Sequence, residues 1–276
     1  MQDANTDDMI FSVAETIALL AQCLTLEPGD AIIMGTPAGV GQARTPPVWM
    51  KPGDVVEIEI DRIGRMLRER GILFCLDAIQ TVGAFETCVD HVDFLSADSH
   101  KWMLGPMSAG IFYVREELQD RLRPSLLGSW NVRSPNFIAQ EEIAFERGGR
   151  RYEPGALNIS GILGMKAGID LILEIGLPAI SAQLLKLKAR LHAGLQPLGF
   201  TFLGPDPHNS VNASCITTVQ HPTRSLEDIN KQLAAKNITP SLRHNRAGQP
   251  LLRFSPHFYN TEAEMDRVAQ VIGEMV

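Results

Sequence analysis

Two apolar runs in the middle of the chain are each followed by a side chain that can do chemistry. Run 72–76 leads into Asp77, and run 92–97 comes shortly before Lys101. A lysine just beyond a buried strand can lose its proton through desolvation and form an imine. An aspartate at the end of a neighbouring strand can keep a pyridine nitrogen protonated, so that the ring acts as an electron sink. Together the two residues indicate pyridoxal 5'-phosphate (PLP) as the cofactor.

Taken singly, these residues have ordinary explanations. A lone aspartate at a strand end is usually a turn or cap residue, a lone lysine is usually a solvated charge, and His100 would be a satisfied polar residue. The combination argues against these explanations, because Lys101 stands inside His-Lys-Trp and is followed by Gly105-Pro106. The set as a whole predicts a catalytic ancestry.

The elements that must position this set alternate between strand and helix. Runs 72–76, 92–97 and 109–114 are almost continuously apolar, which predicts strands of a sheet covered on both faces. Residues 158–174 and 179–195 have helical periodicity. We therefore expect an α/β fold around the lysine.

The C-terminal part carries two helix-start signals. Ser225 with Asp228 and Thr261 with Glu264 have the spacing of capping boxes, the first with aspartate in place of glutamate. Strand-like stretches lie at 213–219, 238–242 and 251–255. These signals predict a smaller α/β domain at this end of the chain.

The N-terminal part has a different, β-rich character. Pro-Gly-Asp turns at 28–30 and 52–54 each precede a strand candidate. The first candidate is 31–34, and the second is 56–60, where valine or isoleucine alternates with glutamate. Such alternation predicts a half-buried strand.

From Gly71 to Val276 the sequence resembles the class V aminotransferase family, which also contains cysteine desulfurases and epimerase-like enzymes. The residues that carry the resemblance are Asp77–Gln80, His100–Trp102, 151–158 and 252–261. The resemblance implies part of the large domain of a PLP-dependent transferase of fold type I over residues 71–176. It also implies the small C-terminal α/β domain over residues 177–276.

The same resemblance gives roles to single residues. Asp77 would hold the pyridine nitrogen, and Gln80 would donate a hydrogen bond to the ring hydroxyl. His100 would contact the phosphate or the active site, and Lys101 would carry the cofactor as a Schiff base. Arg253 would bind the substrate carboxylate, a role that suits a guanidinium because it can fork onto a carboxylate with two hydrogen bonds.

Departures from the family pattern narrow the expected chemistry. Asp98 stands where some relatives place a phosphate-binding serine, and Ala156 stands where many have a threonine that binds phosphate across a dimer. Both changes predict weaker phosphate binding. Desulfurases carry a nucleophilic cysteine in the loop before the arginine, but residues 240–250 contain none. Sulfur transfer is therefore disfavoured, and Cys215 is interpreted as a core residue.

Residues 1–68 resemble the C-terminal end of the fumarylacetoacetate hydrolase family. The resemblance is carried by residues 9–15, 25–30 and 51–56 and by the loop Gly35-Thr36-Pro37-Ala38-Gly39-Val40-Gly41. In that family the glycine-rich loop lines the substrate pocket, so Thr36 would contact substrate. Members act on β-dicarbonyl acids with a divalent cation held by carboxylates that lie upstream of the matched segment. We expect no metal site and a structural role for residues 1–68.

Composition excludes several classes of partner. The chain of 276 residues has 25 Lys and Arg against 32 Asp and Glu, a formal charge of −7, and no basic run that would favour nucleic acid. The N-terminus lacks the basic start and apolar run of a signal peptide, and no membrane span is predicted, so we expect a cytoplasmic protein. Its four cysteines have no metal-like spacing and predict no disulfide framework.

Three hypotheses for function remain open at this point. The first is a PLP-dependent enzyme of class V type that acts on an amino acid as a transaminase, lyase or epimerase, and the resemblance implies a homodimer. The second is a metal-dependent hydrolase or isomerase of the fumarylacetoacetate hydrolase type, motivated only by residues 1–68. The third is an inactive fusion remnant that keeps family sequence but binds nothing.

Overall fold

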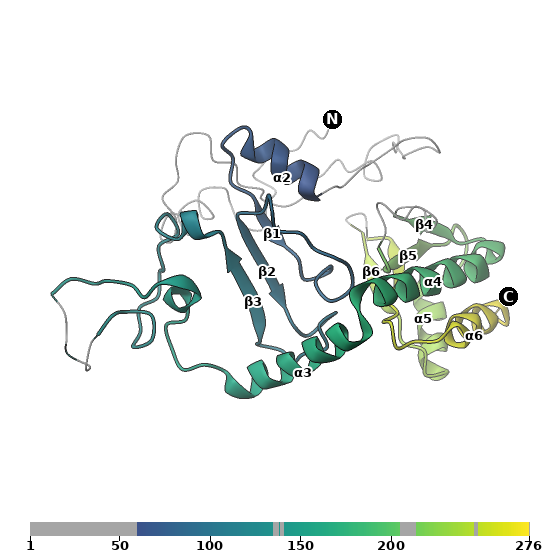
Figure 1. Ribbon diagram of the computed structural model, residues 1–276. Coiled ribbons are helices and arrows are strands. Elements are labelled where there is room, and N and C mark those ends of the chain that lie inside the picture. Colours follow the sequence, from purple (N-terminus) through teal and green to yellow (C-terminus); the bar gives the residue numbers. More distant parts are fainter. Residues whose placement is uncertain (1–59, 135–137, 139–140, 205–213, 246–247, 276) are drawn as a thin grey trace. The chain divides into compact units, whose positions relative to one another are not determined.

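The computed structural model describes residues 60–134, 138, 141–204, 214–245 and 248–275 (Figure 1). These residues belong to two compact units, the first ending at Leu173 and the second starting at Glu174. No single helix in this part of the chain is long and apolar enough to cross a membrane. The consecutive pair Ile159–Ile175 and Leu177–Leu198 reaches that length and composition only when both are counted together.

The first unit is built on a three-stranded sheet in the order β1-β2-β3. Its elements are α2 (Ile60–Arg68), β1 (Cys75–Asp77), β2 (Phe94–Asp98), β3 (Gly110–Val114), the 3-10 helices η3 (Glu116–Leu118) and η5 (Gly148–Tyr152), and α3 (Ile159–Ile175). Strand β1 runs parallel to β2, with Asp77 opposite Ser96, and β2 runs antiparallel to β3. The three apolar runs of the sequence therefore do form neighbouring strands, although β1 begins only at Cys75.

The expectation of a sheet covered on both faces is wrong for the described residues. Only β2 is mostly buried, whereas Cys75 and Asp77 of β1 are exposed. In β3, Ile111 is 36% and Phe112 is 51% exposed. The reason is position in the sheet, because β1 and β3 are both edge strands among the described strands, and an apolar run does not reveal whether a neighbour lies beyond it.

Helix α2 corrects the second N-terminal strand prediction. Ile60, predicted as the last residue of a strand over 56–60, is instead the first residue of α2. In the sequence Ile60, Ile63 and Leu67 recur at helical spacing, and this 3.6-residue period overrides the short alternation before it. Residues 56–59 and the candidate at 31–34 lie outside the described residues.

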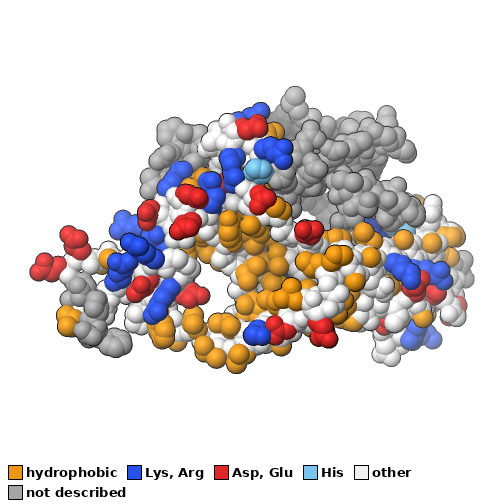
Figure 2. Space-filling model, in the orientation of Figure 1, with side chains coloured by type: hydrophobic (Ala, Val, Ile, Leu, Met, Phe, Trp, Pro, Cys, Tyr) orange, Lys and Arg blue, Asp and Glu red, His pale blue; other side chains and the backbone are white. Residues whose placement is uncertain are grey.

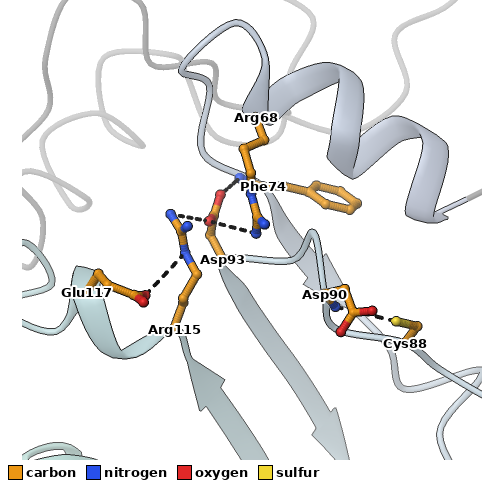
Figure 3. A network of polar contacts seen from close by, with 7 residues as sticks. All are labelled: Arg68, Phe74, Cys88, Asp90, Asp93, Arg115 and Glu117. Carbon is orange, nitrogen blue, oxygen red and sulfur yellow. Dashed lines mark hydrogen bonds and ion pairs between the residues drawn. The ribbon is translucent and has the colours of Figure 1, made fainter.

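A buried carboxylate ties α2 to the sheet (Figure 3). Asp93, which is 3% exposed, accepts a hydrogen bond from the Phe74 N–H at 2.8 Å through Oδ2. Its Oδ1 lies 2.8 Å from Nη2 of Arg115 and 4.0 Å from Nη2 of Arg68. A buried charge is tolerated when it is paired and hydrogen-bonded, so this cluster stabilises the entry to both strands.

The second unit is an antiparallel four-stranded sheet in the order β4-β5-β7-β6, packed with helices. Its elements are α4 (Leu177–Leu195), η6 (Gln196–Leu198), β4 (Thr201–Leu203), β5 (Thr217–Gln220), α5 (Leu226–Ala235), β6 (Ser241–His244), β7 (Pro250–Phe254) and α6 (Glu262–Gly273). The core combines α4, both later helices and the central strands. Its fully buried members include Leu187, Leu191, Leu195, Val219, Leu233, Leu252 and Ile272.

Both capping signals of the sequence are confirmed in this unit. The Ser225 side chain accepts a hydrogen bond from the Asp228 N–H at the start of α5. At the start of α6, Thr261 and Glu264 form both bonds of a capping box. The helix predictions at 158–174 and 179–195 agree with α3 and α4 to within two residues at either end.

Candidate active site

Asp77 and Lys101 follow two parallel strands that end at the same edge of the sheet. Asp77 is the last residue of β1, and Lys101 lies in the loop after β2, which ends at Asp98. Because β1 and β2 are parallel and paired in register, their carboxyl ends point the same way. This edge is where open α/β sheets commonly bind ligands.

The turn after β1 keeps the Asp77 carboxylate next to the strand end. Its Oδ1 accepts a hydrogen bond from the Ile79 N–H at 3.1 Å, and the Ala78 N–H donates to the Ser96 carbonyl at 2.8 Å. The Asp77 residue is exposed, so its carboxylate is accessible to a ligand. A carboxylate in this setting can accept a hydrogen bond from a protonated ring nitrogen.

Gln80, in the same turn, contacts Trp102, the residue after Lys101. Trp102 Nε1 donates a hydrogen bond to Gln80 Oε1 at 3.1 Å. Gly83 has φ +92°, and a Cβ built there would lie 2.7 Å from the Trp102 carbonyl oxygen. Only glycine combines this conformation with this approach, so Gly83 lets the turn lie directly against the lysine loop.

His100 is paired with Asp98, one of the departures noted in the sequence. Its Nδ1 lies 2.9 Å from Asp98 Oδ2, while Asp98 Oδ1 accepts a hydrogen bond from the Ser99 N–H at 2.8 Å. The Asp98 carboxylate therefore faces a histidine and a backbone amide.

The lysine loop is held by a buried serine and by α3. The Ser99 hydroxyl, fully buried, donates to the Pro106 carbonyl at 2.8 Å, and the Gly105 N–H donates to the Ser99 carbonyl at 2.9 Å. On α3, a Cβ at Gly168 would collide with the Met103 carbonyl oxygen, so this glycine lets the helix approach the loop. Lys101 is half-buried in this loop.

The remaining predicted site residues are Arg253 and Thr36. Arg253 is in β7 of the second unit, opposite Thr218 and Ser241 in the sheet. Thr36 lies outside the described residues. The residues that the first unit itself gathers at one sheet edge are Asp77, Gln80, His100 and Lys101.

Two thiols of the described residues, those of Cys75 and Cys215, are poorly suited to nucleophilic chemistry. Cys215 is 1% exposed, and burial raises its pKa to about 12, as expected for the core residue that the sequence predicted. Burial and the nearby Asp77 carboxylate also raise the pKa of Cys75. Within the described residues, no group of three or more His, Cys, Asp or Glu side chains is placed to hold a metal ion.

Two contributors to this site were not given a role from the sequence. In the sequence Trp102 is a signal only as part of His-Lys-Trp, and Ser99 has no predicted role. Their positions beside Lys101 were the available signal, but their partners Gln80 and Pro106 are fixed by the path of the loops. Neither pairing follows from residue spacing.

Comparison with known families agrees with this geometry. Residues 55–268 match the family model for aminotransferase class-V. The chain belongs to this family. Members of the family are PLP-dependent, and one solved neighbour, the cystine C-S lyase C-DES, carries glycine covalently linked to its PLP cofactor. At 18% identity, with a TM-score of 0.62 over 73% of this chain and 51% of that chain, C-DES supports the fold.

Cysteine desulfurases are prominent among the relatives of this class V chain. A probable cysteine desulfurase of Pyrococcus abyssi is 30% identical over 227 residues, which cover 79% of this chain and 56% of that protein. The apo structure of a cysteine desulfurase from Thermococcus onnurineus matches with a TM-score of 0.73 and 29% identity, over 79% of this chain and 56% of that one. The chain thus spans about half the length of these relatives, with the mixed α/β arrangement of fold type I.

A second match covers the N-terminal part. Residues 1–69 match the model for the C-terminal part of fumarylacetoacetate (FAA) hydrolase. Over 69 residues the chain is 46% identical to the mitochondrial oxaloacetate tautomerase FAHD2A of Bos taurus, covering 25% of this chain and 22% of that protein. The two family matches overlap at 55–69, a stretch that contains α2.

The residues at the sheet edge suit the cofactor of the family. An accessible carboxylate ends one strand, and a half-buried lysine lies in the loop after the neighbouring parallel strand. These are the groups that a pyridine nitrogen and an aldehyde require. The Asp98–His100 pair adds a group that can carry positive charge for a phosphate. The chemistry of all four residues, Asp77, Gln80, His100 and Lys101, is compatible with PLP.

Proposed function

We propose that the chain binds PLP as a Schiff base on Lys101 and acts on an amino acid. The observation that carries the proposal is the placement of Asp77 and Lys101 at the carboxyl ends of the parallel strands β1 and β2. When bound, PLP supplies an electron sink that stabilises negative charge at the substrate α-carbon. The residues of this chain would position the cofactor, keep its ring nitrogen protonated and transfer the α-proton of the substrate.

Each residue has a separate part in the proposed site. Asp77 keeps the ring nitrogen protonated by accepting its hydrogen bond, and Gln80 donates to the ring hydroxyl. His100 contacts the phosphate. The Lys101 amine would move the α-proton, and Arg253 would bind the substrate carboxylate.

The reaction class we propose is transamination, elimination or epimerisation rather than sulfur transfer. Several relatives are named as cysteine desulfurases, but residues 240–250 contain no cysteine, and Cys215 is buried with a raised pKa. A thiol in that state is a poor nucleophile at neutral pH. We also propose that residues 71–176 form part of the large domain and that residues 177–276 form the small domain. The same proposal includes a homodimer.

The first experiment is a titration of the purified chain with PLP, followed by visible absorption. We expect an imine band in the parent and in Lys166→Ala, and none in Lys101→Ala. Lys166 is a suitable control because it is an exposed lysine of α3, paired with Asp170 on the same helix. Binding to the native state should also raise the unfolding temperature of the parent by mass action.

Absence of the band from the parent would refute the proposal and favour the inactive remnant. A band that persists in Lys101→Ala would show that PLP reacts with other lysines. With the band present, amino acids are then screened by the spectral change that they cause.

A further inference from the structure

The hydrogen bond between Trp102 and Gln80 determines which way the Gln80 amide faces. An indole N–H can only donate, whereas an amide offers one oxygen acceptor and one NH2 donor. Since Trp102 Nε1 lies 3.1 Å from Oε1 of Gln80, the amide oxygen is committed to the indole. The NH2 group is then the end of Gln80 that can serve a ligand.

The indole is itself held in place, so it can act as a fixed reference for the amide. Trp102 is 4% exposed, and the Gly83 turn lies directly against its backbone carbonyl. The Thr81 and Val82 N–H groups both donate to the Ala78 carbonyl, which fixes the turn that carries Gln80. Rotation of the Gln80 amide would put its NH2 against the indole N–H, so that two donors would face each other.

We infer that Trp102 is a positioning residue that orients Gln80 to donate from Nε2 to an oxygen acceptor on the bound cofactor. The inference rests on the proposed function for its ligand, PLP, and on the observed contact for its mechanism. Donation into the amide oxygen also polarises the amide, which strengthens its NH2 as a donor. Trp102 thus acts on the cofactor through Gln80 rather than by touching it.

The first test uses the full chain without cofactor. With 15N-labelled tryptophan, hydrogen exchange of the Trp102 indole N–H is measured in the parent, in Gln80→Ala and in Gln80→Glu. We expect Gln80→Ala to exchange about tenfold faster, because the N–H loses its acceptor, and Gln80→Glu to stay protected, because a carboxylate still accepts. Equal exchange in the parent and Gln80→Ala would overturn the inference, whatever the chain does with PLP.

The second test measures the Kd for PLP by the visible band in a double-mutant cycle. We expect Trp102→Phe and Gln80→Ala each to weaken binding about fivefold to tenfold, and the double variant to bind no more weakly than Gln80→Ala alone. The pH midpoint of the band should shift in the same direction in all three variants, since each removes or misorients the same donor. Effects that multiply would mean that Trp102 acts independently of Gln80, which overturns the inference.

Two further variants separate this role from general damage. Trp130→Phe makes the same chemical change at an indole that is 44% exposed and should leave the Kd unchanged. Gln80→Glu keeps the contact to Trp102 but has no NH2, so it should bind PLP as weakly as Gln80→Ala even if Trp102→Phe fails to fold. Tight binding by Gln80→Glu would refute the donor role. Absence of PLP binding in the parent would refute both the proposed function and this role.

Discussion

At the scale of single residues, the Asp93 carboxylate shows how a buried charge is made tolerable. Its two oxygens face the Phe74 N–H and the guanidinium of Arg115, with Arg68 at the edge of the cluster. Removal of one partner from a buried pair is costly because the other charge is left uncompensated. The cluster is therefore a point of high sensitivity in the first unit.

We predict that Asp93→Ala destabilises the chain by roughly 3 kcal/mol, at the low end of the usual range because Arg115 is partly solvated. The control is Asp120→Ala, whose fully exposed carboxylate contacts Arg151 at 3.2 Å, and its loss should cost far less than the loss of the Asp93 carboxylate. Urea unfolding followed by circular dichroism measures both. Similar values for the two variants would mean that the Asp93 cluster contributes no more than a surface ion pair.

At the scale of elements, α6 depends on a start signal that is readable in the sequence. We predict that Thr261→Ala destabilises the second unit by about 1 kcal/mol, because the Thr261 side chain accepts from the Glu264 N–H. Thermal or urea unfolding measures the loss, and the exposed Thr223 provides a Thr→Ala control with no expected effect. A loss in Thr223→Ala as large as that in Thr261→Ala would contradict a specific capping role.

This cap should also depend on pH. The Thr261 backbone N–H, and then its hydroxyl, donate to Glu264 and lower the pKa of that carboxyl. Because the pKa of Glu264 is lower in the folded state, its ionised carboxylate stabilises the protein when the pH is above the ordinary pKa of glutamate. This stabilisation is lost as the pH falls through the folded-state pKa. The effect of Thr261→Ala should accordingly shrink in acid.

The elements also show what the sequence could and could not predict. Helix α3, helix α4 and both caps followed from periodicity and spacing, because local sequence determines them. The apolar runs predicted the ends of β1 and β2, near Asp77 and Asp98, to within one residue. The sequence therefore located the edge of the sheet at which Asp77 and the Lys101 loop lie. The pairing of Trp102 with Gln80 could not be predicted, because it depends on how two loops pack.

Strand exposure was beyond prediction for a similar reason. An apolar run such as 109–114 is the same whether its strand is central or at an edge, and only the order of strands in the sheet decides between these cases. The failed prediction at Ile60 has a local cause, since two periodicities meet at that residue.

At the scale of the whole molecule, the first unit leaves apolar side chains in contact with solvent. On α3, Ile159 is 58% and Leu163 is 61% exposed, and Figure 2 shows hydrophobic side chains over the sheet and along this helix. Exposed apolar patches favour association with other surfaces. The part of the chain that matches its relatives covers 56% of their length, so the same elements exist elsewhere within a larger protein.

We predict that Ile159→Gln combined with Leu163→Gln lowers concentration-dependent light scattering of the chain without lowering its unfolding temperature, because both side chains are already exposed. Lys166→Gln on the same helix is the control, since it changes charge but not apolar area. Unchanged scattering in the double variant would mean that self-association does not use this part of α3.

The position of α2 bears on how two ancestries came to share one polypeptide. This helix lies where the two family matches overlap, and its last residue, Arg68, reaches the carboxylate between β1 and β2 (Figure 3). The segment shared by the two family matches therefore does more than connect them, because its helix ends in a residue that takes part in the charge pairing of the first unit.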